Sequence, residues 1–254
     1  MTERGISGVG LAAIFATVLA GCGAARTHGV AGVHTTLVRT CPAGAHRPVG
    51  PVGASWAAIV LRPAAAYRAP GRAPIARFGL LNVNRVTTVF GVVGEQVDAR
   101  CRAQWLHVLL PMRPNGVTGW VRASHVQLVR VRTRIVVDLS DRRVRFYKRG
   151  RLVFSSSAAI GSSATPTPLG RYYVNQRLIP RDPGGPYGPG AVGISAFSPV
   201  LTGWTQGGPI AIHGTNEPWS IGCNVSNGCI RVRNPVLRRL FDATSAGTPV
   251  EIRP

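Results

Sequence analysis

A short stretch near the C-terminal end of the sequence concentrates the residues that can do covalent chemistry. It holds the last histidine of the chain, His213, and the last two cysteines, Cys223 and Cys229. A thiol attacks as its thiolate, and an adjacent imidazole can take the proton and remain as the counter-cation. One cysteine and one histidine therefore suffice for acyl transfer. We expect Cys229 to be the nucleophile and His213 its base, provided that the chain folds back between them.

The neighbours of this pair supply supporting groups. Gly228 allows the backbone to approach a substrate closely, and the amides of residues 227–229 are candidates for binding an oxyanion. No aspartate lies close to His213 in the sequence. We therefore expect a backbone carbonyl to orient the imidazole, with Gly214 as the first candidate and the carboxylate of Glu217 as its rival.

Two other interpretations of the same residues stay open. A disulfide between Cys223 and Cys229 would silence the nucleophile. Zinc held by Cys223, Cys229 and His213 would make the site structural. That set lacks a Cys-x2-Cys pair and a convincing fourth ligand, so no metal is expected.

The N-terminus indicates export. A basic region at Arg4 is followed by an apolar run over residues 8–20 and by Leu19-Ala-Gly-Cys, which ends at Cys22. The run is shorter than the ~20 apolar residues that span a bilayer. Leu-Ala-Gly-Cys resembles the bacterial lipobox, which implies that Cys22 is lipidated and anchors the protein on the outer face of the plasma membrane. The alternative is an ordinary signal cleaved between residues 20 and 25.

The charge balance is strongly basic. Lysine and arginine number 30 against nine acidic residues, for a net charge of +21, and Lys148 is the only lysine. A polyanionic neighbour is expected, either nucleic acid or the anionic polymers and phospholipids of a bacterial envelope. Export and the lack of a basic motif interleaved with aromatic residues argue against nucleic acid. The arginine runs are then solvated strand faces attracted to the envelope.

Two further cysteines, Cys41 and Cys101, precede the chemical segment. Outside the cytoplasm a disulfide persists, so these two are a candidate structural pair. Closing a loop of about 60 residues would contribute ~4 kcal/mol in the chain-entropy model. The alternative is two buried free thiols.

The remaining sequence predicts mostly strands. Short β-rich runs separated by turns occupy residues 56–130, with a tight hairpin expected at Asn115-Gly116. Three strands of a meander follow within residues 135–154, and then two loops rich in proline and glycine. Asn234 is expected to cap a short helix, with Pro235 at its first position, before a last strand at residues 249–252.

These residues resemble two families. The runs around Trp105 and Trp120 resemble a bacterial Src-homology-3-like domain, in which the two tryptophans are either core residues or a platform for wall material. Gly170 after a Thr-Pro-rich turn, Ile-His-Gly-Thr at 212–215 and Ser-Asn-Gly-Cys-Ile-Arg at 226–231 resemble the L,D-transpeptidase, or YkuD, catalytic domain.

The resemblance implies roles for individual residues. Cys229 is the nucleophile, His213 the base and Gly214 the orienting carbonyl. Substrate contacts are expected from the remaining motif residues and one aromatic: Trp219, Ser226, Asn227, Gly228 and Arg231. The family commonly has histidine where this chain has Asn227, whose amide donates a hydrogen bond but carries no proton. Trp219 is expected either to line the groove or simply to pack.

The resemblance also implies the architecture. We expect a mainly β protein, with a signal peptide over residues 1–21, a flexible tether over 22–55, a small β-barrel over 56–130, and a β-sandwich catalytic domain with a short helix over 131–254.

The activity that this resemblance implies is peptidoglycan crosslinking in cell-wall biogenesis and the maintenance of cell shape. A tetrapeptide stem donates its acyl group through a Cys229 acyl-enzyme, with release of D-Ala and with no cofactor. Carbapenems would acylate the same cysteine. The alternatives are an L,D-carboxypeptidase and a catalytically idle wall-binding lipoprotein.

Overall fold

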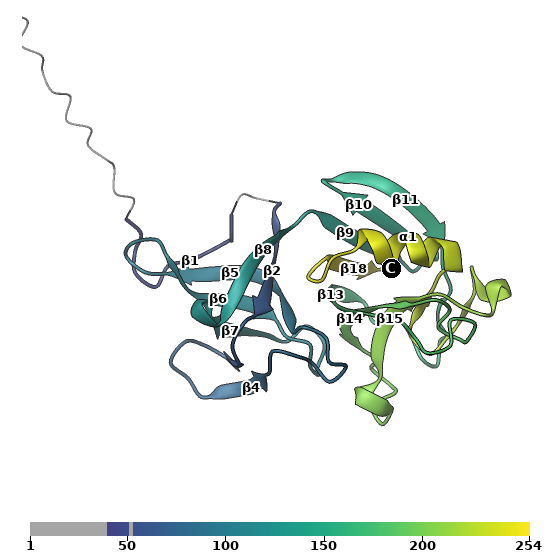
Figure 1. Ribbon diagram of the computed structural model, residues 1–254, viewed down its shortest axis with the longest axis horizontal. Coiled ribbons are helices and arrows are strands. Elements are labelled where there is room, and N and C mark those ends of the chain that lie inside the picture. Colours follow the sequence, from purple (N-terminus) through teal and green to yellow (C-terminus); the bar gives the residue numbers. More distant parts are fainter. Residues whose placement is uncertain (1–39, 51–52) are drawn as a thin grey trace, which may run out of the picture. The chain divides into compact units, whose positions relative to one another are not determined.

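The computed structural model of the protein describes residues 40–50 and 53–254 (Figure 1). The expected signal peptide and the lipidation site Cys22 lie outside the described residues. None of the helices in the described part is both long and apolar enough to cross a bilayer.

The N-terminal part of the described chain folds into one antiparallel sheet. Its eight strands are β1 (His46–Arg47), β2 (Ser55–Val60), β3 (Ala64–Tyr67), β4 (Pro74–Phe78), β5 (Val89–Val97), β6 (Ala103–Leu109), β7 (Thr118–Arg122) and β8 (Val126–Val131). The spatial order is β4-β3-β7-β6-β5-β2-β8, and β1 pairs with β5. One face buries Phe90, Leu106 and Val121, each fully inaccessible to solvent. The two tryptophans, Trp105 and Trp120, are also buried, which disfavours a role as an exposed platform.

The structure differs from the expected tether over its last residues. Cys41 is bonded to Cys101, and the Gly44 amide donates to the Val97 carbonyl at 2.9 Å. Strand β1 then adds to the edge of β5. The segment from residue 40 to residue 50 is therefore attached to the N-terminal sheet.

The expected tight hairpin at Asn115-Gly116 is wrong. Strands β6 and β7 do pair, but β6 ends at Leu109 and β7 begins at Thr118, so the connection is far longer than two residues. Gly116 has a positive φ of 83°, whereas Asn115 does not. The Asn115 side chain bonds instead to the backbone of Phe197, whose amide lies 2.9 Å from Asn115 Oδ1.

The C-terminal part forms a second sheet of eight strands. These are β9 (Thr133–Asp138), β10 (Arg143–Lys148), β11 (Arg151–Ser157), β13 (Gly170–Leu178), β14 (Ala191–Phe197), β15 (Pro209–His213), β17 (Ile230–Arg231) and β18 (Pro249–Arg253). Their order is β11-β10-β9-β18-β13-β14-β15-β17, with parallel pairs at β9–β18 and β15–β17. Strands β12 (Ile160–Gly161) and β16 (Asn224–Ser226) form a separate parallel pair.

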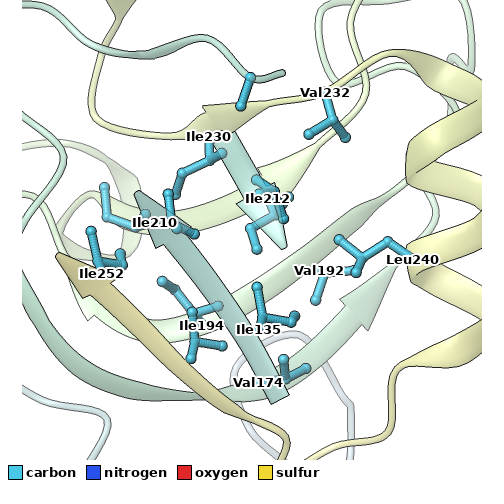
Figure 2. Close-up of a cluster of buried hydrophobic side chains, with 14 of the residues drawn as sticks. Ile135, Val174, Val192, Ile194, Ile210, Ile212, Ile230, Val232, Leu240 and Ile252 are labelled. Atoms are coloured by element: carbon cyan, nitrogen blue, oxygen red, sulfur yellow. The ribbon is translucent and has the colours of Figure 1, made fainter. Parts of the chain in front are cut away.

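The core of this part is aliphatic and lies between the strands and the one α-helix of the described residues. Figure 2 shows isoleucine and valine side chains from several strands meeting Leu240 of α1 (Asn234–Ala243). Leu237 and Leu240 are buried, and α1 packs on β14 and β15. The mainly β fold with a short helix is thus confirmed. Three short 3-10 turns complete the elements, at Ala123–His125, Thr205–Gly207 and Pro218–Ser220.

Asn234 does not cap the helix as expected. It is the first helical residue, and Arg233 precedes it at the cap position without a side-chain cap. Asn234 Oδ1 accepts a hydrogen bond from the Thr215 amide at 2.8 Å. The side chain is therefore used to fix the loop that follows His213.

Candidate active site

Two neighbouring parallel strands bring His213 and Cys229 together. His213 ends β15, and Cys229 directly precedes β17, with Ile212 opposite Ile230 in the register. Because side chains alternate along a strand, Ile212 and Ile230 point into the core while His213 and the residue before Ile230 face the other side. The fold-back that the sequence required is thus a parallel strand pair.

The backbone fixes the orientation of His213. Nδ1 lies 2.6 Å from the carbonyl oxygen of Gly214, which accepts only if Nδ1 carries the proton. Nε2 is then the basic nitrogen. The ring centroid of Tyr187 lies 4.9 Å from that of His213 and restricts the imidazole further. Glu217, the rival orienting group, forms an ion pair with Arg231 instead.

The electrostatics of the pair favour the neutral forms. Burial lowers the pKa of His213 from 6.5 to about 4, and the nearby Arg231 guanidinium acts in the same direction. Burial also raises the pKa of the Cys229 thiol, which outweighs the Ala211 backbone hydrogen bond and Arg231. Both shifts favour a neutral thiol and a neutral imidazole over a thiolate–imidazolium ion pair. Cys229 Sγ lies 4.0 Å from the carbonyl oxygen of Pro209, so any hydrogen bond between them is weak.

A compact turn supports Cys229. Ser226 Oγ donates to the Cys229 carbonyl at 2.5 Å and accepts from the Gly228 amide at 3.2 Å. Thr167 Oγ1 donates to the Gly228 carbonyl at 2.9 Å. Gly228 has a φ of 103°, and a β-carbon there would lie 3.0 Å from Ile210 Cδ1, so the position requires glycine. Because its amide is engaged by Ser226, Gly228 is not a free oxyanion donor.

The loop after His213 is equally constrained. Gly188 has a φ of 58°, and added β-carbons at Gly188 or at Gly214 would both collide with Asn234 Oδ1. That oxygen accepts the Thr215 amide, as described above. The Gly214 carbonyl that orients His213 is therefore held by tight packing around a single amide side chain.

Cys229 opens onto a hollow of about 770 Å³. The hollow is lined by Asn227 and by aromatic side chains that the sequence analysis did not select, Tyr187 and Trp204. Trp204 is 51% exposed, and the signal available in the sequence was a tryptophan in a Gly-rich loop. Trp219 is 70% exposed and is not among the residues that line this hollow.

Loops that connect strands of the N-terminal sheet hold one wall of this hollow. Asn115 exchanges two hydrogen bonds with the backbone of Phe197, and Arg113 Nη2 donates to the carbonyls of Ser198 and Gly207 at 2.6 and 2.5 Å. Asn84 bonds the side chain of Gln206 and lines the hollow itself. Sequence spacing gave no indication of these contacts, because the partners are more than 80 positions apart.

The two cysteines of the C-terminal part are not bonded to each other in the structure. Cys223 and Cys229 are both free thiols, and Cys223 is exposed. No grouping of three or more His, Cys, Asp or Glu side chains suited to a metal ion occurs in residues 40–50 and 53–254.

Comparison with known proteins identifies the part of the chain that carries this site. A family model described as the L,D-transpeptidase catalytic domain, YkuD, matches residues 132–252. These residues form an L,D-transpeptidase catalytic domain. The catalytic domain contains His213, Cys229 and the whole turn around them.

Curated relatives carry the same family name. The chain is 40% identical over 121 residues to a Bacillus licheniformis protein named as an L,D-transpeptidase, YkuD, covering 48% of this chain and 66% of that protein. It is 35% identical over 118 residues to the Bacillus subtilis protein of that name, covering 46% and 64%. The match thus spans slightly less than two thirds of the length of these relatives.

Solved structures of L,D-transpeptidases also match part of this chain. An Enterococcus faecium L,D-transpeptidase mutant is 27% identical, with a TM-score of 0.37 and coverage of 48% of this chain and 50% of that one. A Mycobacterium smegmatis L,D-transpeptidase is 19% identical, with a TM-score of 0.39 and coverage of 65% and 90%. These superpositions are too weak to add to the fold description.

Proposed function

We propose that the protein is a peptidoglycan L,D-transpeptidase that works through a Cys229 acyl-enzyme. The observation that carries the proposal is the parallel pair β15–β17, which places His213 and Cys229 on one face of the sheet, beside a hollow. The Gly214 carbonyl fixes the imidazole with its basic nitrogen free. An oriented base beside an accessible thiol is the arrangement that acyl transfer needs.

The first half-reaction forms a thioester. His213 Nε2 takes the thiol proton as Cys229 Sγ attacks the carbonyl of the L-centre of diaminopimelate in a tetrapeptide stem. Because the resting thiol is neutral, proton transfer accompanies attack. The imidazolium then gives that proton to the departing amine, and D-Ala leaves. Amides of Asn227 and Cys229 are the candidates for stabilising the oxyanion, since that of Gly228 is engaged.

The second half-reaction makes the crosslink. The side-chain amine of a second stem attacks the thioester carbonyl and loses a proton to His213, and Cys229 leaves as a thiol once it regains that proton. Water in place of the amine gives L,D-carboxypeptidase activity. The chemistry needs no cofactor, and a carbapenem would acylate Cys229 in the position of the donor.

The location of this activity follows from the N-terminus. We propose export and attachment to the outer face of the plasma membrane through lipidated Cys22, facing the wall. The peptidoglycan stem peptides are then the partners, and nucleic acid is not. The expected small barrel over residues 56–130 would serve as the wall-proximal support of the catalytic domain.

The deciding experiment measures D-Ala release from a disaccharide tetrapeptide by the full chain. We expect release by the native protein and none above background for Cys229→Ala. Cys223→Ser is the matched control, because it removes an exposed thiol six positions away and should retain release. The absence of release from the folded native protein would favour the idle wall-binding module.

Product analysis separates the two enzymatic alternatives. A crosslinked dimer formed when an acceptor stem is added supports transpeptidation. Tripeptide alone, at the same rate with and without the acceptor, would establish a carboxypeptidase instead.

A further inference from the structure

A second hollow, of about 620 Å³, differs in its lining residues from the hollow that contains Cys229. Four of its lining residues are the arginines Arg130, Arg132, Arg134 and Arg149, and we refer to it as the arginine hollow. Its other walls come from residues 53–55, Val131, Thr133, Tyr147 and Gly150. None of these residues lines the hollow that contains Cys229.

The strand pattern aligns three of the four guanidinium groups. Val131 and Thr133 are buried, while Arg130, Arg132 and Arg134 alternate with them and are exposed. Alternate residues of an extended chain project from one face about 6–7 Å apart. The stretch from β8 into β9 thus presents a regular row of positive charges.

The fourth arginine arrives from a different element. Arg149 lies in the turn between β10 and β11, and its amide donates to the Arg132 carbonyl at 2.7 Å. The neighbouring strand β10 also positions Arg134, whose guanidinium carbon lies 4.6 Å from the centroid of the Tyr147 ring. Guanidinium groups from two directions therefore surround one space.

Acidic groups scarcely neutralise this cluster. Within the described part of the chain, the one carboxylate at ion-pair distance from these arginines is that of Glu251, which lies 3.8 Å from Arg134 Nη1. Arg130, Arg132 and Arg149 form no ion pair among the described residues. Four like charges around one hollow repel each other, and a ligand with several negative charges removes that repulsion.

We propose that the arginine hollow binds a polymer that carries phosphate groups at regular intervals. A row of charges matches repeated anions better than a single ion. A tetrahedral phosphate directs oxygens towards guanidinium groups on different elements, such as Arg132 and Arg149, whereas a planar carboxylate favours one fork at a time. The hollow would hold the enzyme along an anionic wall polymer, independently of the acyl transfer.

The test measures binding of linear inorganic polyphosphate to the full chain by calorimetry at several salt concentrations. The variant is Arg130→Gln with Arg132→Gln and Arg149→Gln. The matched control is Arg62→Gln with Arg68→Gln and Arg72→Gln, which removes the same charge from exposed positions outside the hollow. Circular dichroism checks that both variants fold.

We expect the hollow variant to bind polyphosphate at least tenfold more weakly and the control variant less than about threefold. The slope of log K against log salt should fall by about 2 for the hollow variant, since each lost phosphate contact removes about 0.7–0.9. Equal weakening of both variants would overturn the proposal, because the binding would then follow net charge alone.

Three further probes define the ligand. Orthophosphate that binds as tightly as the polymer, or polyglutamate that does so, would overturn the repeated-phosphate assignment. Phosphatidylcholine vesicles are compared with and without phosphatidylglycerol. If the hollow variant loses the preference for anionic vesicles but keeps its affinity for polyphosphate, the site recognises lipid headgroups and the polymer assignment is wrong.

Discussion

The N-terminal sheet and the catalytic domain each contain two cysteines within the described residues, in opposite chemical states. Cys41 and Cys101 are far apart in the sequence and are bonded to each other. Cys223 and Cys229 are close in the sequence and remain thiols. In the first region, sulfur attaches an edge segment to a sheet. In the second, strand β16 follows Cys223 and a glycine-containing turn then directs Cys229 towards a hollow.

The difference shows that sequence proximity does not determine disulfide pairing. The bonded pair is brought together by β1 and β5, whose backbones pair beside it. The thiol pair is separated by its surroundings, since Cys223 is exposed whereas Cys229 is partly buried and lines the hollow. In the catalytic domain both cysteines are free, and the His213 ring is oriented by the Gly214 carbonyl.

The largest expected effect comes from removing the base. His213→Gln replaces the imidazole by an amide of similar reach, which cannot accept and return a proton, so D-Ala release should fall about 10²–10⁴-fold. The steady-state rate on the disaccharide tetrapeptide gives the measurement. A loss of less than tenfold would mean that Cys229 is activated by another group. Cys41→Ser with Cys101→Ser is the control, and it should keep the rate at 25 °C.

The same control variant should lose stability. Opening the loop of 60 residues removes ~4 kcal/mol in the chain-entropy model. For a chain of this size that corresponds to a fall in Tm of about 10 °C. Scanning calorimetry measures the shift. An unchanged Tm would show that β1 and its contacts already hold the segment without the covalent bond.

The pH dependence of the free energy of unfolding should reveal the lowered pKa of His213 in the folded protein. Its pKa is lowered from 6.5 to about 4 in the folded protein. Between these values the unfolded chain binds a proton that the folded protein does not, so the free energy of unfolding should rise with pH over this range. Stability is lost as the pH falls from 6.5 towards 4. Comparing Tm at pH 4.5 and 7 for the native protein and His213→Gln isolates this contribution, and identical slopes would contradict it.

The smallest expected effect is a difference in alkylation rate between Cys229 and Cys223. Burial raises the pKa of Cys229, so its alkylation by iodoacetamide at pH 7.5 should be slower than that of exposed Cys223. Mass spectrometry of peptides over a time course gives both rates. Faster modification of Cys229 would indicate a thiolate already formed at rest, and the proton transfer proposed above would then precede attack.

Most strands and the turn that contains Cys229 could be predicted from local pattern, whereas the walls of the hollow could not. Alternation predicted the meander of β9 to β11, and the motif around Cys229 marked its turn. Asn115 and Asn234 were misassigned because their spacing fits a local turn and a local cap. Each side chain instead bonds backbone from a distant segment, Phe197 and Thr215 respectively. Trp204 was missed because no period marks an irregular loop.

The crowding around the Asn234 amide limits which substitutions this catalytic domain can accept. Side chains larger than hydrogen at 188 or 214 meet the same oxygen, so neither position is able to change alone without displacing it. Replacing Asn234 by a smaller residue would not free either position, because a β-carbon at 188 would still lie 2.8 Å from the Thr215 nitrogen and one at 214 would lie 2.9 Å from Pro189 Cδ. The Thr215 amide would also lose its acceptor. A saturation library over these three positions should therefore return the parental combination almost exclusively, which makes the trio a diagnostic for functional homologues.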